Sequence, residues 1–467
     1  MAATATVPAT EKHPKGLYVL FATEMWERFG FYSMLAMFAL YLKNAEQGFG
    51  WESAKATSLY ANYLMFVYAS PLIGGWIADR FLGYKRSVLV GGVIFMLGYA
   101  LLTVHSLPAV YGALALLVIG NGFFKPNVSA MVGNQYAEGS HLKDRAYNIF
   151  YMGINIGAFL APLIAEAVKQ NYGVHAAFAV AAIGMVISVT ILWRFKSLIE
   201  GAEKRVPAAG ASPTASTSPV AGASPLVGEE PLPRRPIDDV PSARRIGALI
   251  VIYLVVIVFW MVFHQNGSTL TYWANDNTDW ASSRVLSTLV WLLSFGAVSM
   301  EKVSGTLSNA INPFFVITLT FPLVWFWQWL DRRKREPATT TKIMCGMFLT
   351  AISFYLLYLG GKAGGDTGRV SPWWLIGAYF IITTGELMLS PMGLSLVSKV
   401  APAHLRGVMM GGWFAATAIG NKLTMIGVYW DKWLHSTFFL VLGTAALVMG
   451  FVLFGLLRPL KKWMPGA

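Results

Sequence analysis

The chain has 467 residues, of which 55% are apolar or aromatic and only 13% are charged. Soluble domains carry about 25% charged residues, so this composition excludes an ordinary soluble protein. The net charge of +13 does not indicate nucleic-acid binding, because most basic residues lie in short clusters between long apolar runs. The single cysteine, Cys345, excludes a disulfide framework and a Cys-x-x-Cys metal site.

A membrane-spanning helix needs about 20 apolar residues, and runs of this length follow one another along the chain. The first six helices are predicted at 17–42, 54–79, 87–105, 108–135, 146–170 and 174–198. The second six are predicted at 246–273, 308–330, 342–361, 373–400, 407–430 and 436–458. A further apolar stretch, 285–300, is too short to span the membrane comfortably. We expect it to lie along the outer surface or to enter it partly. If it does span, the number of transmembrane helices becomes odd and the C-terminus lies outside.

The basic residues orient these helices. With both termini in the cytoplasm, the 36 lysines and arginines divide into 25 in inner segments, 8 in outer segments and 3 within predicted helices. Such an excess is expected on the cytoplasmic side of a membrane protein. The localisation expected is therefore the plasma membrane, which in a bacterium is the inner membrane, crossed several times with both termini cytoplasmic.

Composition also divides the chain into parts. They are a cytoplasmic tail (1–16), a six-helix bundle (17–199), a cytoplasmic linker rich in Pro, Ala and Ser (200–243), a second six-helix bundle (244–459) and a cytoplasmic tail (460–467). Six helices, a linker and six helices is the plan of a major facilitator. We therefore expect an all-α membrane protein whose 12 transmembrane helices form two bundles around a central cavity.

Ionisable residues interrupt three of the predicted helices. They are Glu24, Glu27 and Arg28 in the first helix, Lys125 in the fourth and Glu386 in the tenth. A charge at the bilayer centre costs ~2.5–3.5 kcal/mol on insertion scales, so such residues are kept mainly where they pair, move an ion or hold a substrate. Glu24 and Arg28 share a helix face and can pair at i,i+4. This pattern indicates a transporter, and a purely structural ion network between the first and fourth helices is the alternative.

A loop motif lies between the second and third helices. It reads Gly75-x-x-x-Asp79-Arg80-x-x-Gly83-x-Lys85-Arg86. This resembles the loop motif of the major facilitator superfamily, in which an acidic residue at a helix end and basic residues surround a tight turn. The resemblance implies a contact between neighbouring helices at the cytoplasmic face that favours one conformation.

Other stretches carry a more specific resemblance. Glu24-x-x-Glu27-Arg28-Phe29-x-Phe31-Tyr32 resembles the first-helix signature of the proton-dependent oligopeptide transporter (POT or PTR) family. Phe150-Tyr151-Met-Gly-Ile154-Asn155-Ile-Gly157 is similar to its fifth-helix signature. Later family stretches match in order at Phe259-Trp260, Gln265-x-Gly267-Ser268, Asn312-Pro313 and Gly385-Glu386-Leu-Met-Leu-Ser390-Pro391. The resemblance covers about residues 17–458, apart from the linker and 285–300.

The resemblance implies roles for the matching residues. Those implied in proton coupling are Glu24, Glu27, Arg28 and Lys125, with His264 as a further candidate. Those implied in substrate binding are Glu386 at the peptide amino terminus, Asn155 and Asn312 at the peptide backbone, and Trp260 and Trp413 around its side chains. Further substrate-binding candidates are Tyr32, Tyr68, Lys125 and Ser390.

The chain departs from the family pattern at two positions. Members often carry a basic residue where this chain has Leu35, so the peptide carboxylate would depend more on Lys125 and Arg28. Many bacterial members carry a glutamate where this chain has His264, which could titrate near neutral pH and join the proton path. A neutral cavity histidine is the equally weighted alternative. Plant members that carry nitrate also have a histidine in this helix.

The function implied is a proton-coupled symporter that imports di- and tripeptides by alternating access. Three glutamates set against Arg28 and Lys125 leave one negative charge, which one proton neutralises and a zwitterionic peptide does not change. Two alternatives are symport of nitrate or another small anion on the same fold, and a membrane peptide sensor that does not transport. We expect no enzyme activity, metal or cofactor beyond the coupling proton. The expected partners are peptides, protons and the lipid bilayer, and the protein is expected to be monomeric.

Three further ionisable residues lie outside these patterns. Lys422, near the middle of the eleventh predicted helix, is expected either to line the cavity or to pair with a neighbouring helix. Glu166 and Lys169 lie near an outer helix end, and we expect both to extend to the membrane interface.

Overall fold

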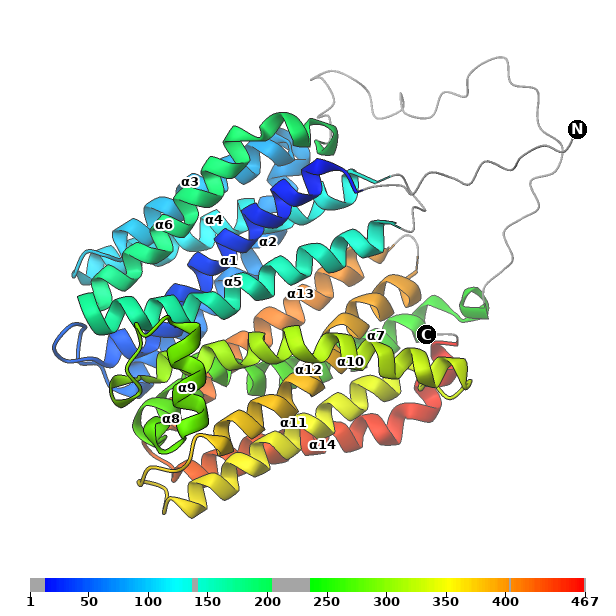
Figure 1. The fold of residues 1–467 in the computed structure, drawn as a ribbon. Helices are drawn as coiled ribbons and strands as arrows, with labels where there is room; N and C mark the ends of the chain where they lie inside the picture. The colour runs from blue at the N-terminus through cyan, green and yellow to red at the C-terminus, as the bar shows by residue number, and fades with distance from the viewer. Residues whose placement is uncertain (1–12, 137–141, 204–235, 403–404, 466–467) are drawn as a thin grey trace, which may run out of the picture. The chain divides into compact units, whose positions relative to one another are not determined.

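The computed structural model describes residues 13–136, 142–203, 236–402 and 405–465, and these fold almost entirely into helices (Figure 1). Within these ranges no β-strand is formed, and a single isolated bridge joins Thr278 and Val370. Most of the predicted tail 1–16 and of the predicted linker 200–243, and the last two residues of the tail 460–467, lie outside the described residues.

The helices before the predicted linker are α1 (Lys15–Lys43), α2 (Ser53–Ile77), α3 (Tyr84–Leu101), α4 (Leu107–Asn134), α5 (Leu142–Tyr172) and α6 (Val174–Arg194). Those after it are α7 (Ser242–Phe263), α8 (Thr269–Asp276), α9 (Arg284–Leu293), α10 (Ile311–Arg332), α11 (Thr339–Ala363), α12 (Trp373–Val400), α13 (Arg406–Leu423) and α14 (His435–Trp463). Three short turns matter below: η1 (Ala78–Leu82), η5 (His264–Gly267) and η8 (Gly305–Ala310).

Each of the twelve predicted helices corresponds to a long helix in the structure. In the ranges that the structure describes, nine helical stretches are long and apolar enough to cross a membrane. The helix α1, which carries Glu24, Glu27 and Arg28, is not among the nine. Large apolar side chains point outward on several helices, among them Ile73, Trp325 and Phe454 at 67%, 67% and 61% exposure. Outward-facing apolar surface of this kind is typical of helices that face lipid.

The chain forms two compact units. The first lies within the bounds Met1–Phe49, Ser70–Lys204 and Thr288–Ile317, and the second within Gly50–Ala69, Arg205–Ser287 and Thr318–Ala467. The boundaries at 69/70 and 317/318 fall inside α2 and α10, so both long helices begin in one unit and end in the other. The prediction of two bundles, 17–199 and 244–459, remains a prediction.

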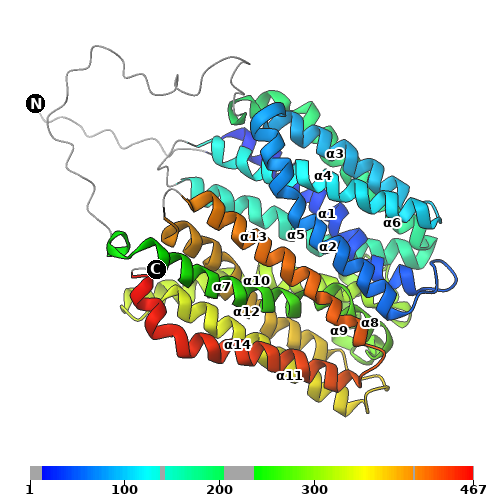
Figure 2. The same cartoon turned by 180° about the vertical axis from the view of Figure 1, so that it is seen from behind.

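Glycines let the helices of the first unit approach closely. A Cβ built on Gly157 of α5 would lie 2.2 Å from the carbonyl oxygen of Met25 in α1. One built on Gly91 of α3 would lie 2.8 Å from the carbonyl oxygen of Gly120 in α4. Small residues at helix crossings allow membrane helices to pack backbone against backbone. As a result α1 lies beside α5, and α3 lies beside α4 (Figure 2).

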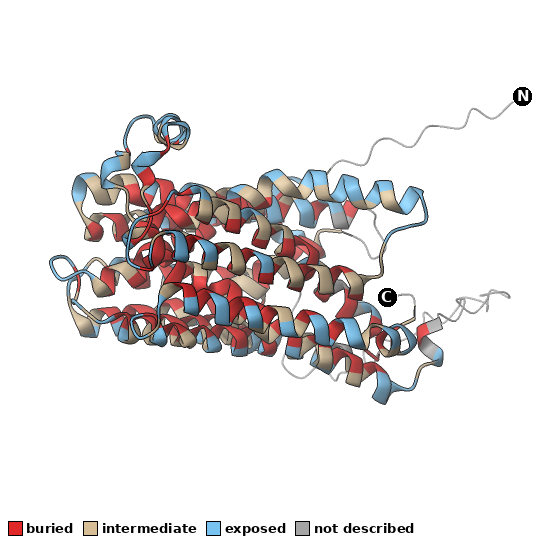
Figure 3. Cartoon of the chain, turned by 90° about the horizontal axis from the view of Figure 1, so that it is seen from below, coloured by how far each residue is buried: buried red, intermediate tan, exposed pale blue. Residues whose placement is uncertain are grey.

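The second unit packs in the same way around large aromatic residues. The helix α11 lies beside α12 and α14, and a Cβ on Gly346 of α11 would lie 2.7 Å from the carbonyl oxygen of Gly385 in α12. Trp273 and Trp430 are among the largest fully buried side chains. Figure 3 shows buried residues on the inner faces of the helices and exposed residues on their outer faces.

The seventh predicted helix, 246–273, is broken in the structure. After Phe263 the chain forms η5, and Ser268 leaves the helical region with φ −131° and ψ −95° before α8 begins. A Cβ on Gly267 would lie 1.8 Å from the hydroxyl oxygen of Tyr60 in α2. Only glycine leaves room for this tyrosine, so a contact that hydropathy does not reveal accompanies the break.

The predicted surface segment 285–300 contains the short helix α9. This helix has 10 residues, and of its side chains only Val290 is buried. The chain then turns at Phe295 and Gly296, both with positive φ (53° and 79°), and the Phe295 side chain is 97% exposed. The segment is thus too short to span a membrane, as predicted, while its location at the membrane surface remains a prediction.

Candidate functional site

The charged residues of α1 form one buried cluster. Glu24, Glu27 and Arg28 are 1%, 0% and 3% exposed. Arg28 forms the predicted i,i+4 ion pair with Glu24, with 3.3 Å between Nε and Oε1. It also donates two hydrogen bonds to Glu27, from Nε to Oε2 at 2.5 Å and from Nη2 to Oε1 at 2.9 Å. Sequence reasoning missed this second pair, because residues three or four apart are the ones expected to pair on a helix, and the adjacent Glu27 is reached only by the long side chain of Arg28.

The two carboxylates are therefore held differently. Both oxygens of Glu27 are bound by Arg28 in the paired geometry that gives the strongest ion pairs. The Oε2 atom of Glu24 is buried and has no hydrogen-bond partner among the residues that the structure places. Glu24 thus has a carboxylate oxygen that can accept a proton without breaking a hydrogen bond.

Lys125 of α4 belongs to the same cluster. It is half-buried and interacts electrostatically with Glu24, Glu27 and Arg28. Close packing of α4 helps to place it, since a Cβ on Gly122 would lie 2.9 Å from the backbone of α2. The structure thus brings together the four residues of α1 and α4 that were predicted to couple protons.

Three predicted substrate-binding residues also lie in the first unit. Tyr32 is half-buried on α1, one turn beyond Arg28. Asn155 of α5 is 7% exposed and donates a hydrogen bond from Nδ2 to the Tyr151 carbonyl oxygen at 2.9 Å. Asn312 is half-buried in the first turn of α10, a part of that helix that belongs to this unit.

In the second unit, three predicted residues meet next to the break after α7. The ring of His264 stacks on Trp260, with centroids 4.9 Å apart and planes 20° apart. The ring of Tyr68 lies 5.7 Å from the same histidine. Both His264 and Trp260 are buried, at 8% and 9% exposure. The histidine therefore lies in a cluster of aromatic rings with Trp260 and Tyr68.

The remaining predicted substrate residues lie on α12 and α13. Glu386 and Ser390 are half-buried and one turn apart on α12, so they share a face. Trp413 of α13 is 3% exposed, and a Cβ on Gly393 of α12 would lie 1.9 Å from its ring. Glycine at this position therefore allows the indole ring to pack directly on the α12 backbone.

The predicted turn of the loop motif is confirmed. Gly83 has φ +75°, a conformation that favours glycine, and it follows the π-helical turn η1. The Tyr84 hydroxyl donates to Oδ1 of Asp79 at 2.8 Å, and Nζ of Lys85 lies 3.9 Å from Oε2 of Glu203. The other motif residues are Gly75, packed on Pro126, and the exposed Arg80 and Arg86.

Two other ionisable groups have partners far away in the sequence. Glu166 is 0% exposed and pairs with Lys169 and with Ser304, which lies 138 residues further along the chain. The prediction that Glu166 extends to the interface is therefore wrong, and no local sequence signal marks its distant partner. Lys422 of α13 donates a hydrogen bond to Oδ1 of Asn62 in α2, which confirms the pairing alternative.

The part of the chain that the structure describes contains no group of three or more His, Cys, Asp or Glu residues placed to hold a metal ion. Some of its ionisable residues instead form a buried cluster on α1, a helix packed among apolar helices. Buried, paired charges in such helices define an integral membrane transporter, because the cost of burial is tolerated mainly where ions or substrates move.

Comparison with known proteins identifies the family. A family model described as the POT family matches residues 85–199 and 235–433, and the chain belongs to this family. It is 30% identical to the di-/tripeptide transporter of Lactococcus lactis subsp. lactis (strain IL1403), over 97% of this chain and 96% of that protein. It is 29% identical to dipeptide and tripeptide permease A of Proteus mirabilis (strain HI4320), over 89% of this chain and 87% of that protein. These relatives are transporters and not enzymes.

Solved structures agree with this assignment. The crystal structure of peptide transporter POT in complex with sulfate is similar to this chain with a TM-score of 0.82 and 29% sequence identity. The similarity covers 98% of this chain and 97% of that one. A POT family transporter in complex with 5-aminolevulinic acid is similar with a TM-score of 0.80 and 25% identity.

Proposed function

We propose that this chain is a proton-coupled symporter that imports di- and tripeptides by alternating access. The observation that carries the proposal is the buried cluster of Glu24, Glu27, Arg28 and Lys125 in a chain of the POT family. The names of its relatives, a di-/tripeptide transporter and a dipeptide and tripeptide permease, support the substrate class.

The proposal includes the arrangement in the membrane. Twelve transmembrane helices in two six-helix bundles would cross a bacterial inner membrane, with both termini in the cytoplasm. The excess of basic residues in the inner segments supports this orientation. We propose a monomer that needs no metal or cofactor besides the coupling proton and that binds no nucleic acid.

Within the ion cluster we propose that Glu24 accepts the coupling proton. Glu27 is occupied by Arg28, whereas Oε2 of Glu24 is buried without a hydrogen-bond partner among the described residues. Protonation of Glu24 leaves the Arg28–Glu27 pair intact and removes one negative charge from a buried site. When Glu386 is counted, the three glutamates exceed Arg28 and Lys125 by one negative charge, which this proton neutralises. Closing a dry site around an uncompensated charge is costly, so the proton lowers the cost of occlusion.

We propose that substrate contacts come from half-buried and buried residues on several helices. The carboxylate of Glu386 would bind the peptide amino group, and Lys125 would bind the peptide carboxylate. Asn155 and Asn312 would hydrogen-bond the backbone. The side-chain pocket would be formed by Tyr32, Tyr68, Trp260, His264, Ser390 and Trp413. The stacking of His264 on Trp260 supports a role in the pocket wall, and a role in the proton path is the alternative.

The decisive experiment is uptake of labelled di-alanine by purified protein in sealed liposomes. With an imposed inward proton gradient we expect accumulation, and with the gradient collapsed we expect only equilibration. Accumulation of nitrate that di-alanine does not reduce would favour the anion alternative. Binding of di-alanine without any uptake would favour the sensor.

A further inference from the structure

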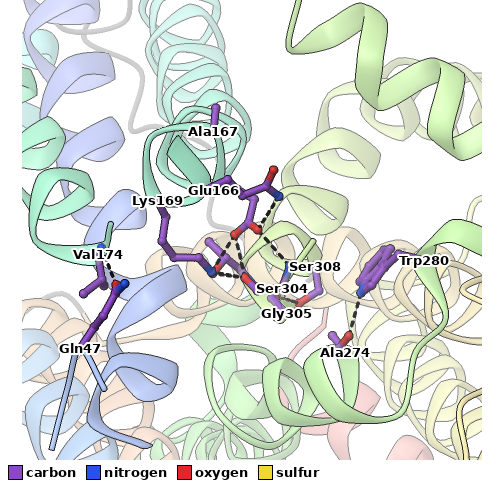
Figure 4. A network of polar contacts seen from close by, with 12 residues as sticks. Gln47, Glu166, Ala167, Lys169, Val174, Ala274, Trp280, Ser304, Gly305 and Ser308 are labelled. Carbon is purple, nitrogen blue, oxygen red and sulfur yellow. Dashed lines mark hydrogen bonds and ion pairs between the residues drawn. The ribbon is translucent and has the colours of Figure 1, made fainter. Parts of the chain in front are cut away.

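The C-terminal turns of α5 hold a segment that lies more than a hundred residues further along the chain. Glu166, Lys169, Gln170 and Asn171 of α5 bind residues 297–306, the segment that precedes α10. Figure 4 shows Glu166 and Lys169 of this group next to Ser304. We call these four residues and their contacts with 297–306 the α5 clasp. All of it lies within the first unit.

Glu166 is the centre of the α5 clasp. Its side chain is 0% exposed, and Oε1 accepts hydrogen bonds from the backbone N–H of Ser304 at 2.9 Å and from Nε2 of Gln170 at 3.0 Å. Oε2 accepts the Ser304 hydroxyl at 2.7 Å and lies 2.9 Å from Nζ of Lys169. Lys169 also donates to the hydroxyls of Ser304 and Thr306. The buried charge is thus fully compensated while the segment stays in place.

The neighbouring residues hold the backbone of the same segment. Gln170 accepts the N–H of Ser299 at 2.9 Å and donates to the carbonyl oxygen of Ser299 at 3.3 Å. Asn171 donates to the carbonyl oxygen of Ala297 at 3.2 Å. Because these bonds go to main-chain atoms, they fix the path of the chain at two points before η8 begins.

The α5 clasp has a mechanical consequence because α10 is continuous. The helix starts in the first unit and passes into the second after Ile317. Any rearrangement that moves the second unit relative to the first must act on α10 close to the point that Glu166 fixes. The α5 clasp must then resist this movement or release.

We infer that Glu166 and Lys169 form a releasable lock of the transport cycle, which holds the segment before α10 while the outer side is closed and lets go when it opens. This inference rests on the proposed function and on the predicted topology, which puts the end of α5 outside. Neither residue is assigned to substrate or to the coupling proton, so they are positioning residues. Opening requires the two hydrogen bonds that Ser304 donates to the buried carboxylate of Glu166 to be exchanged for water.

The test follows the accessibility of the segment directly. The only native thiol is removed by Cys345→Ser, and a reporter is introduced by Ala310→Cys in η8, where the native side chain is 5% exposed. Labelling by a membrane-impermeant maleimide is then timed for full-length protein in liposomes. The test variants are Glu166→Gln and Lys169→Met, and the matched control is Glu301→Gln, which removes an exposed carboxylate from the same segment.

We expect labelling at least about tenfold faster in both test variants and unchanged in the control. A tenfold change corresponds to about 1.4 kcal/mol, which is close to the lower limit for one hydrogen bond to a charged group. Equal labelling rates in all proteins, with equal thermal stability, would overturn the inference.

Transport by the same proteins separates this inference from the proposed function. If the lock acts in the cycle, the KM for external di-alanine falls severalfold in Glu166→Gln, because the outward-open state becomes more populated, while the dependence of uptake on the proton gradient is retained. Faster labelling with an unchanged KM and an unchanged maximal rate would overturn the role in the cycle. If the unmodified protein shows no uptake, the proposed function fails, and the labelling rates alone decide whether the lock exists.

Discussion

At the scale of single residues, two glutamates one turn apart have different surroundings. Their spacing places Glu24, Glu27 and Arg28 on one face of α1, and this much follows from helix geometry. The spacing does not reveal that Arg28 binds Glu27 through two nitrogen atoms and touches Glu24 through one. That difference depends on side-chain conformations, which the packing around α1 selects.

The two glutamates should respond differently to neutralisation. We expect both Glu24→Gln and Glu27→Gln to abolish uptake driven by a pH gradient and to spare peptide counterflow. Glu27→Gln should in addition destabilise the protein, because removing one partner of a buried ion pair costs ~3–5 kcal/mol. Proteoliposome uptake and thermal unfolding in detergent measure the two effects.

The control for these variants is Glu46→Gln, which changes an exposed carboxylate after α1. It should leave uptake and melting temperature unchanged. If Glu24→Gln keeps full gradient-driven accumulation, the assignment of the proton to Glu24 is wrong.

At the scale of helices, glycines decide which helix approaches which. The fifth-helix signature contains Gly153 and Gly157, and both pack against the backbone or side chains of α1. A Cβ on Gly153 would lie 2.9 Å from the ring of Phe21. Because of this packing, Asn155 lies on a helix, α5, that directly neighbours the helix of the ion cluster, α1. The sequence predicts both helices from hydropathy, but their partners depend on shape.

Substitution of Gly157 by valine should disrupt this crossing. The added Cβ would lie 2.2 Å from a carbonyl oxygen of α1, so the helices must separate. Overpacking of this kind typically costs ~1–3 kcal/mol, and we expect a lower melting temperature together with reduced peptide uptake.

The matched control is Gly247→Ala on α7, where nothing lies within 4 Å of an added Cβ. It should leave stability unchanged or raise it by up to about 1 kcal/mol, because alanine favours a helix more than glycine does. Equal melting temperatures for the two variants would contradict the role assigned to the α1–α5 crossing.

A second prediction for helices concerns the start of α14. Asp366, in the loop after α11, accepts a hydrogen bond from the backbone N–H of Ser436 at 2.6 Å and so caps this helix from another part of the chain. Burial alone would raise the pKa of Asp366, but hydrogen bonding to Ser436 and attraction by Lys362 outweigh it and lower the pKa below its usual value. The ionised form is therefore the one that the fold stabilises.

The sign of the pH dependence follows from this lowered pKa. The contribution of Asp366 is fully present above the pKa of an unfolded aspartate, about 3.9, and is lost as the pH falls through the lower pKa of the folded state. Asp366→Ala should cost about 1 kcal/mol near neutral pH, as typical capping residues do. Melting curves from neutral to acidic pH should show the difference between native protein and variant shrinking. A difference that is constant down to the most acidic pH would refute the capping role.

At the scale of the whole molecule, hydropathy predicted every long helix, and most predicted bounds differ from the observed ones by a few residues. The seventh and eleventh predicted helices, 246–273 and 407–430, end earlier in the structure, at Phe263 and Leu423. Hydropathy is a local property of the chain, so a single sequence is sufficient to locate the long helices.

Apart from the pair of Arg28 with the adjacent Glu27, the features that the sequence did not predict join distant residues. They are the break after α7, where Tyr60 packs on Gly267, and the buried pair of Glu166 with Ser304. Neither partner is marked by composition or spacing.

Polar side chains on α2, α5 and α13 form hydrogen bonds with residues from the other half of the sequence. Ser304 and Thr306 satisfy Glu166 and Lys169 of α5, and Asn62 of α2 satisfies Lys422 of α13. Ser53 at the start of α2 likewise donates to Asp431 at 3.0 Å. Polar groups inside one half therefore depend on donors and acceptors that the other half supplies.

These hydrogen bonds between the two halves of the sequence determine what happens when the gene is divided within codons 204–235. Either fragment alone would leave these polar groups without the partners that they have in the intact chain, and we expect it to be degraded in the membrane. Coexpressed fragments should assemble into a functional pair without a covalent connection, measurable by copurification through a tag on one fragment and by restored di-alanine uptake. Stable accumulation of the N-terminal fragment by itself would show that Glu166 does not need its distant serine.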